Sequence, residues 1–178
     1  MKKVKILDKE FKITIPAASV KQVIDNMALQ ITNDYTDEEV FFVGILNGAF
    51  MFSADLIKKI RLQCQVSFVK LSSYDGSSSS GEVRELIGLI DDIKGRHVIV
   101  LEDIVETGLT LETIIKLLKP MKPASLKIAT LLFKPQAYQQ NLKLDYIGLE
   151  IPNQFIIGYG LDYNGYGRNY EDIYSAIK

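Results

Sequence analysis

Apolar and polar positions along the chain follow two periods, one typical of buried strands and one typical of amphipathic helices. Short apolar runs predict strands that are buried on both faces of a parallel sheet. Between them, apolar residues recur at helical spacing. In order, the main elements are strand 40–46, a helix to about residue 60, strand 66–71, strand 98–101, helix 111–119, strand 126–133 and strand 146–149, with a further helix from Ser19 to Ile31 before them. Strands that alternate with helices predict an α/β fold with a largely parallel sheet.

The remaining stretches carry weaker patterns. Residues 4–15 alternate loosely and predict a short hairpin or an edge strand, and 171–177 has the spacing of a closing helix. The serine-rich stretch 72–83 reads as a loop, and it becomes a long hairpin tip if 84–90 returns as a strand. No repeat or linker divides the chain, so we expect residues 1–178 to form one domain.

Composition excludes several classes of protein. A net charge of −1 gives no bulk attraction to nucleic acid or to an anionic membrane. The single cysteine, Cys64, cannot form an internal disulfide and fits a reducing compartment. The chain has no run of about 20 apolar residues, and no long apolar stretch follows its N-terminal lysines, so we expect a cytoplasmic protein without a signal peptide or a membrane span.

The main candidate binding and catalytic residues come at the end of the strand that begins near His97 and directly after it. Two adjacent carboxylates, Glu102 and Asp103, stand at the carboxyl end of this strand, where open α/β sheets bind ligands. A turn and a helix follow, and the free amides at the start of the helix favour a phosphate. Acids beside a phosphate site suggest Mg²⁺, which prefers oxygen ligands. The alternative is a solvated turn in which the acids only cap the helix.

The stretch from Val98 to Thr110, VIVLEDIVETGLT, resembles the phosphoribosyl diphosphate (PRPP) motif of the type I phosphoribosyltransferases, and the whole chain from about residue 40 is most similar to their hypoxanthine-guanine branch. The resemblance implies a five-stranded parallel core with helices on both faces. It also implies a small hood, built from about 1–18 and 151–178, over the base site.

The resemblance assigns the turn to the 5-phosphate and ribose of PRPP. The residues expected to bind there are Glu102, Asp103, Ile104, Val105, Glu106, Thr107, Gly108, Leu109 and Thr110. Glu106 stands where the family usually has Asp, and the implied role is catalytic, as acid or base at N7 of the purine. The longer side chain moves its carboxylate by more than an ångström unless it folds back.

A second loop, Leu46-Asn47-Gly48-Ala49, also lies between a strand and a helix and resembles the family's diphosphate-binding loop, which often contains a non-proline cis peptide. The family often has Lys where this chain has Asn47, so one positive charge is missing. The alternative is a simple turn between strand and helix. By resemblance, Arg168 also binds diphosphate.

The expected purine-binding residues are Lys134, Phe155, Ile156 and Asp162. By resemblance Lys134 reaches O6, and because lysine only donates, it would select 6-oxopurines over adenine. Phe155 would stack on the base. Asp162 would join Glu102 and Asp103 as a metal ligand, and Ser73-Tyr74 would mark a lid.

The resulting hypothesis is a Mg²⁺-dependent enzyme of purine salvage that uses PRPP and a 6-oxopurine, with a dimer or tetramer implied by the family. Two alternatives belong to other classes. One is a PRPP-binding regulator with the same fold and no salvage activity. The other is a phosphoacceptor receiver domain. Such a domain requires a pair of acids after its first core strand, and this chain has Asn47 and Gly48 there, which argues against this alternative.

Overall fold

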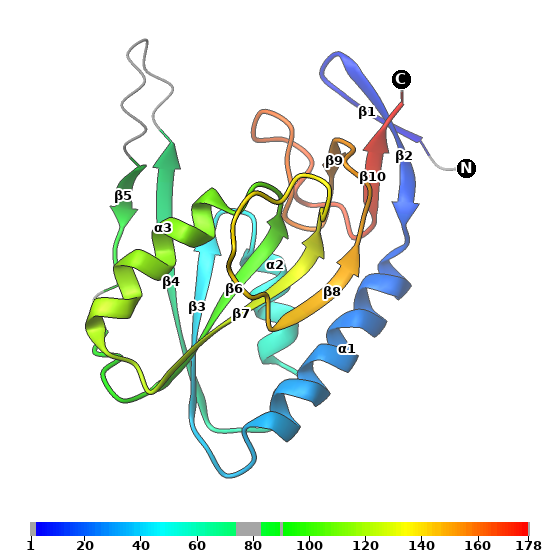
Figure 1. The fold of residues 1–178 in the computed structure, drawn as a ribbon. Helices are drawn as coiled ribbons and strands as arrows, with labels where there is room; N and C mark the ends of the chain where they lie inside the picture. Colours follow the sequence, from blue (N-terminus) through cyan, green and yellow to red (C-terminus); the bar gives the residue numbers. More distant parts are fainter. Residues whose placement is uncertain (1–2, 74–82, 90, 178) are drawn as a thin grey trace.

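The computed structural model describes residues 3–73, 83–89 and 91–177 (Figure 1). In this part of the chain, a 6-stranded sheet has the order β5-β4-β3-β6-β7-β8, in which β5 is antiparallel to β4 and the other pairs are parallel. The strands are β3 (Val40–Leu46), β4 (Cys64–Ser73), β5 (Val83–Ile87), β6 (His97–Val105), β7 (Ser125–Phe133) and β8 (Tyr146–Glu150). The expected five-stranded parallel core is confirmed.

Helices cover both faces of this sheet. On one face, α1 (Ala17–Asp34) and α2 (Phe50–Ile57) pack on a core that includes Phe42 and Ile99. On the other face, α3 (Leu109–Leu118) packs on the alternate residues of the same strands, such as Phe41 and Val98. Because neighbouring residues of a strand point to opposite faces, burial on both faces accounts for the continuous apolar runs.

A second, antiparallel sheet is built from the two ends of the chain (Figure 1). Its order is β1-β2-β10-β9, with β1 (Lys3–Ile6), β2 (Lys9–Ile15), β9 (Ile156–Ile157) and β10 (Ile173–Ala176). Phe11, Ile157 and Tyr174 form a small core of its own. The expected N-terminal hairpin and the expected meeting of the terminal segments are confirmed.

The predicted helix over 171–177 is wrong. Residues Ile173–Ala176 form β10, which pairs with β2 on one side and with β9 on the other. This pairing satisfies backbone groups along both edges of the strand. The partners come from distant parts of the chain, so the local spacing of apolar residues favoured the wrong element.

Other boundaries differ by a few residues. Helix α2 ends at Ile57 rather than near 60, and a short 3₁₀ helix, Lys119–Met121, follows α3. Strand β6 continues to Val105, so the two carboxylates lie inside the strand. Within the stretch 134–140, residues 135–137 form a turn. Strand β5 confirms the predicted return strand but ends at Ile87 instead of 90. Within the described residues, no helix has both the length and the apolar character that crossing a membrane requires.

Candidate active site

The two adjacent carboxylates are buried at the centre of the main sheet. Glu102 is 7% exposed and Asp103 is 6% exposed, and Oε2 of Glu102 has no hydrogen-bond partner among the described residues. Burial, and then the neighbouring Asp103 carboxylate, raise the pKa of Glu102. Burial also raises the pKa of Asp103, while Arg168 acts in the opposite direction. Such a pair of buried acids offers oxygen ligands to a cation.

The predicted phosphate turn surrounds a cavity of about 270 Å³. Its lining residues are Glu102, Ile104, Val105, Glu106, Thr107, Gly108, Thr110 and Leu111, which are the predicted residues with the exception of Asp103 and Leu109 and with Leu111 added. Gly108 directly precedes α3 with a φ of 84°, and a Cβ there would meet Tyr138 at 2.5 Å. Only glycine combines that conformation with that space. The N-cap residue, Gly108, has no side chain to cap α3, and the first amide, that of Leu109, donates only a long hydrogen bond of 3.5 Å to the Thr107 hydroxyl, which an anion can replace.

Glu106, which lines this cavity, forms an ion pair with Lys134. Lys134 directly follows β7, and its backbone amide donates to the carbonyl of Val105, the last residue of β6. Its side chain is 4% exposed, whereas that of Glu106 is 49% exposed. The two residues with expected roles at O6 and N7 of the purine therefore lie side by side, with the carboxylate nearer the solvent.

The diphosphate loop packs directly on the buried acids. The peptide between Leu46 and Asn47 is cis, as the resemblance implied. A Cβ at Gly48 would lie 1.9 Å from Oδ2 of Asp103, so no side chain fits at this position. On its other side, a Cβ at Gly160 would lie 2.2 Å from the Gly48 carbonyl oxygen. The loop is therefore held between β6 and the C-terminal segment.

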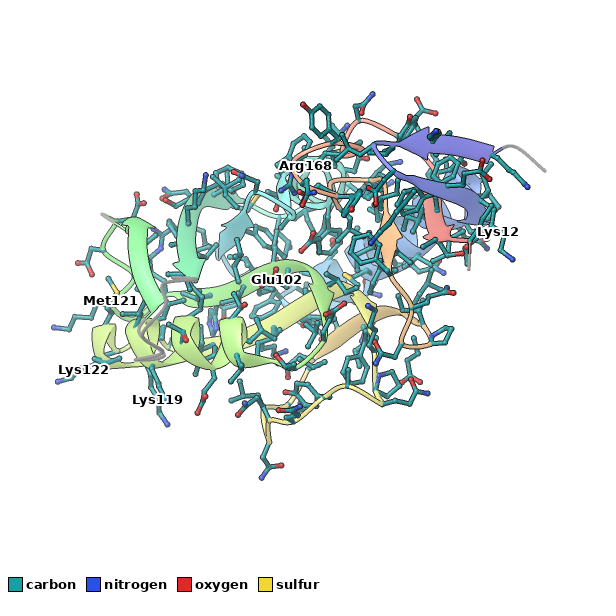
Figure 2. All side chains as sticks on the ribbon, turned by 90° about the horizontal axis from the view of Figure 1, so that it is seen from above. Lys12, Glu102, Lys119, Met121, Lys122 and Arg168 are labelled. Atoms are coloured by element: carbon teal, nitrogen blue, oxygen red, sulfur yellow. The ribbon has the colours of Figure 1, made fainter. Side chains whose placement is uncertain are left out.

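Arg168 joins the C-terminal segment to this centre. Its guanidinium donates to the Gly160 carbonyl at 2.6 Å and pairs with Asp162 at 2.6 Å. Viewed from above the sheet, Figure 2 shows Arg168 on the C-terminal segment and Glu102 on β6. The positive charge of Arg168 acts to lower the pKa of Asp103, against the larger effect of burial. The diphosphate loop, the acid pair and the predicted residues Asp162 and Arg168 thus converge.

The expected three-acid metal site is not assembled from protein groups alone. Over residues 3–73, 83–89 and 91–177, no group of three or more His, Cys, Asp or Glu side chains is arranged to hold a metal ion. Asp162 is instead engaged by Arg168 and by the Gly165 amide, 2.6 Å from its Oδ2. A metal bound here needs further oxygen ligands from a substrate.

The predicted base-stacking residue lies on the antiparallel sheet. Phe155 is 45% exposed, and its ring centroid is 5.6 Å from that of Tyr163 and 6.2 Å from that of Phe11. Ile156 is buried in β9 and pairs with β10. Among the described residues, neither Phe155 nor Ile156 contacts Lys134 through a hydrogen bond or an ion pair. Ser73 ends β4, and Tyr74 lies outside the described residues.

Comparison with known proteins agrees with this geometry. The model of the phosphoribosyl transferase domain matches residues 16–164. The chain belongs to the phosphoribosyltransferase family. A hypoxanthine-guanine phosphoribosyltransferase of Staphylococcus epidermidis is 42% identical over 158 residues, which are 88% of each chain. The hypoxanthine phosphoribosyltransferase of Escherichia coli K12 is 39% identical over 155 residues, 85% of this chain and 87% of that protein.

Solved structures of phosphoribosyltransferases have the same fold. A hypoxanthine-guanine phosphoribosyltransferase of Bacillus anthracis, with a HEPES molecule in its active site, has a TM-score of 0.89 and 36% identity, and the match covers 93% of this chain and 98% of that chain. These comparisons confirm the predicted family and branch, and with them the α/β fold and the enzyme class.

No sequence pattern indicated one contact between distant segments of this phosphoribosyltransferase. Tyr159 donates a hydrogen bond to Asp55, on helix α2. Tyr159 stands between two glycines in the segment that resembles the family, which was the available signal. No sequence pattern singled out Asp55, which has the spacing of an ordinary exposed helix residue.

Proposed function

We propose that this protein transfers the 5-phosphoribosyl group of PRPP to N9 of hypoxanthine or guanine and releases diphosphate. The observation that carries the proposal is the ion pair between Lys134 and Glu106, a residue that lines the predicted phosphate cavity. It sets a donor-only side chain beside a carboxylate, and these are the two groups that O6 and a protonated N7 on one edge of a purine require. A 6-oxopurine accepts from lysine, whereas the amino group of adenine does not.

The phosphates of PRPP are bound at two helix starts. The 5-phosphate would occupy the cavity of about 270 Å³, where the amides at the start of α3 and the hydroxyls of Thr107 and Thr110 donate to it. The diphosphate would lie against Asn47 and Gly48, close to the guanidinium of Arg168. Arg168 supplies the positive charge that Asn47 does not.

The buried acids fit a magnesium ion. The unpartnered Oε2 of Glu102 and the raised pKa of both acids indicate a site that favours a cation. Glu102 and Asp103, with Asp162 after its release from Arg168, would hold Mg²⁺ together with oxygens of PRPP. When bound, the ion supplies charge neutralisation for the departing diphosphate.

Two side chains of this protein bind the purine and accept its proton. Lys134 donates a hydrogen bond to O6, and the Glu106 carboxylate accepts the proton at N7 as N9 bonds to C1 of the ribose. Substrate must first separate the two side chains, because in the free protein each is the other's partner. Phe155, which is half-exposed, would stack on the base.

The test is nucleotide formation from PRPP and Mg²⁺ with hypoxanthine, guanine and adenine offered separately. We expect turnover of the two 6-oxopurines and none of adenine. Turnover of adenine would refute the role of Lys134. PRPP binding without turnover of any base would refute the proposed transferase activity and favour a PRPP-binding regulator. Light scattering in the same buffer tests the expected dimer or tetramer, and cell fractionation tests the expected cytoplasmic location.

A further inference from the structure

One side-chain hydrogen bond crosses between the two segments that flank the diphosphate site. The hydroxyl of Tyr159 donates to Oδ2 of Asp55 at 2.5 Å, over a separation of 104 residues in the sequence. Asp55 belongs to α2, which begins at Phe50, directly after the diphosphate loop. Tyr159 directly precedes Gly160, which packs on the carbonyl of Gly48.

The Tyr159 end of this bond is held firmly. The side chain is buried, and the backbone amides of Tyr159 and Gly160 donate to the carbonyls of Tyr170 and Arg168 at 2.7 and 2.9 Å. Tyr159 has a φ of 48°, a conformation that bulky residues adopt only where their surroundings impose it. Its ring therefore has a defined position relative to Arg168.

The Asp55 end is held as a charged acceptor. Lys58 pairs with the other oxygen of the Asp55 carboxylate at 2.6 Å. Hydrogen bonds to charged groups are stronger than those between neutral groups. A buried tyrosine hydroxyl that loses this acceptor has no other hydrogen-bond partner among the described residues.

Packing at this junction is incomplete. A cavity of about 460 Å³ borders both Tyr159 and Asp55, and it is also lined by Ile24, Met51 and Lys21. Side chains packed at full density would keep α2 and the C-terminal segment in register without a hydrogen bond. Tyr159 shares an apolar core with Phe52 and Leu56 of α2, and the hydrogen bond adds a directional contact on the side where the cavity leaves open space.

We propose that Tyr159 and Asp55 are positioning residues for diphosphate, which fix the Asn47-Gly48 loop relative to Arg168 and Asp162. Neither side chain needs to touch the substrate. The inference rests on the proposed function, because it takes the Gly48 loop and Arg168 as the diphosphate-binding groups.

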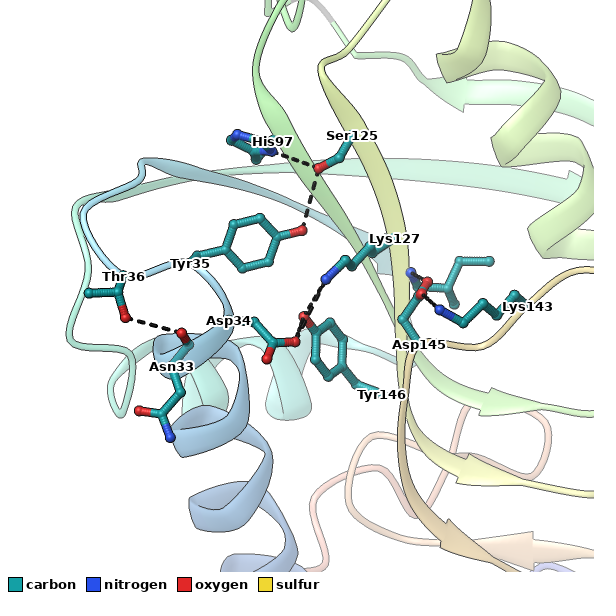
Figure 3. Close-up of polar contacts among 11 residues, drawn as sticks. Asn33, Asp34, Tyr35, Thr36, His97, Ser125, Lys127, Lys143, Asp145 and Tyr146 are labelled. Atoms are coloured by element: carbon teal, nitrogen blue, oxygen red, sulfur yellow. Dashed lines mark hydrogen bonds and ion pairs between the residues drawn. The ribbon is translucent and has the colours of Figure 1, made fainter.

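The test compares Tyr159→Phe with a matched control, Tyr146→Phe. The buried Tyr146 also donates to an aspartate, Asp34, at 2.8 Å, among the polar contacts of Figure 3, but it is the first residue of β8 and lies at the amino ends of the parallel strands. Each variant removes the hydroxyl by which a buried tyrosine donates to a partly exposed aspartate, and Tyr146→Phe also removes an acceptor of Lys127, so the control loses at least as much structural bonding as the test variant. A purely structural role therefore predicts the same behaviour for both variants.

We expect both variants to lower the melting temperature. Only Tyr159→Phe should raise the dissociation constant of PRPP, measured by calorimetry with Mg²⁺, by about tenfold. The KM for PRPP should rise in parallel, while the KM for hypoxanthine stays within about twofold. Asp55→Asn keeps an acceptor but removes its charge, so it should show the same pattern with a smaller shift, and it replaces Tyr159→Phe if that variant does not fold.

The inference is overturned if the PRPP dissociation constants of Tyr159→Phe and Asp55→Asn remain within about twofold of the wild type. It is also overturned if Tyr146→Phe shifts PRPP binding equally. Failure of the proposed function looks different, because the wild type then turns over no base. If the wild type binds PRPP without turnover, the PRPP dissociation constants of Tyr159→Phe and Asp55→Asn, compared with that of Tyr146→Phe, still decide the positioning role. A wild type that binds no PRPP would overturn both the proposed function and the positioning role.

Discussion

Gly48→Ala is the substitution whose consequence follows most directly from the coordinates. The added Cβ would lie 1.9 Å from Oδ2 and 2.4 Å from Cγ of Asp103. Real Cβ contacts essentially never fall below 3.0 Å, so the loop or the carboxylate must move by about 1.1 Å, the difference between 3.0 and 1.9 Å. Gly48 is not among the residues with positive φ, so the effect of alanine here comes from space and not from backbone conformation.

Neither side of this contact can yield easily. Asp103 is buried within β6, and the Gly48 carbonyl is in turn pressed against Gly160. Overpacking of this kind costs roughly 1 to 3 kcal/mol in free energy of unfolding. A displacement of about 1 Å in a substrate-positioning group reduces the rate about 100-fold. We therefore expect kcat/KM for PRPP to fall about 100-fold.

The assay is initial-rate kinetics with varied PRPP at saturating hypoxanthine, together with thermal unfolding. Gly95→Ala is the control, because a Cβ there meets nothing within 4 Å although its φ is 70°. It should cost stability, by about 1 kcal/mol, through backbone conformation alone and leave kcat/KM unchanged. A Gly48→Ala enzyme with kcat/KM within about threefold of the wild type would refute the packing of this loop on Asp103.

Four further outcomes follow from the site. Lys134→Met should lower kcat/KM for hypoxanthine by at least about 100-fold while PRPP binding persists in calorimetry, because the O6 acceptor loses its only assigned donor. Glu106→Gln should lower kcat by about 100-fold with little change in KM for PRPP; unchanged kcat would exclude an acid–base role. Removal of Mg²⁺ with a chelator should abolish turnover without changing the far-UV circular dichroism, and added Mg²⁺ should restore it. Partial burial acts to raise the pKa of Asp55, but hydrogen bonds from Lys58 and Tyr159 outweigh it and the net pKa is lowered. A lowered folded-state pKa means that the unfolded state binds more protons, so this stabilisation is present above the unfolded pKa of about 3.9 and is lost as pH falls below it. Melting temperature should therefore decline less steeply in acid for Asp55→Asn than for the wild type.

The phosphate turn shows how far local sequence can identify a site. The residues from Glu102 to Thr110 are contiguous, and a strand followed by a helix brings their amides and side chains to one place whatever surrounds them. The cavity there is lined by residues that the sequence singled out, with Leu111 as the addition. Gly108 lies within this contiguous stretch, and its φ of 84° is a conformation that glycine adopts readily.

The pairing of Glu106 with Lys134 required the sheet. The two residues are 28 positions apart, and they meet because β6 and β7 are parallel neighbours whose carboxyl ends lie at the same edge. The resemblance had given each a role on the purine. It had not shown that in the free protein the lysine, nearly without solvent contact, is neutralised by the glutamate that replaces the usual aspartate.

The sequence by itself determined the α/β alternation, the parallel core and the phosphate turn, because these depend on the period of apolar residues and on groups that are adjacent in the chain. Tertiary structure alone decided that residues 173–176 form a strand, that Gly48 is wedged between Asp103 and Gly160, and that Tyr159 reaches Asp55. Each of these is a contact between distant segments. Such contacts are selected by the packing of the whole molecule, and no local pattern of side chains encodes them.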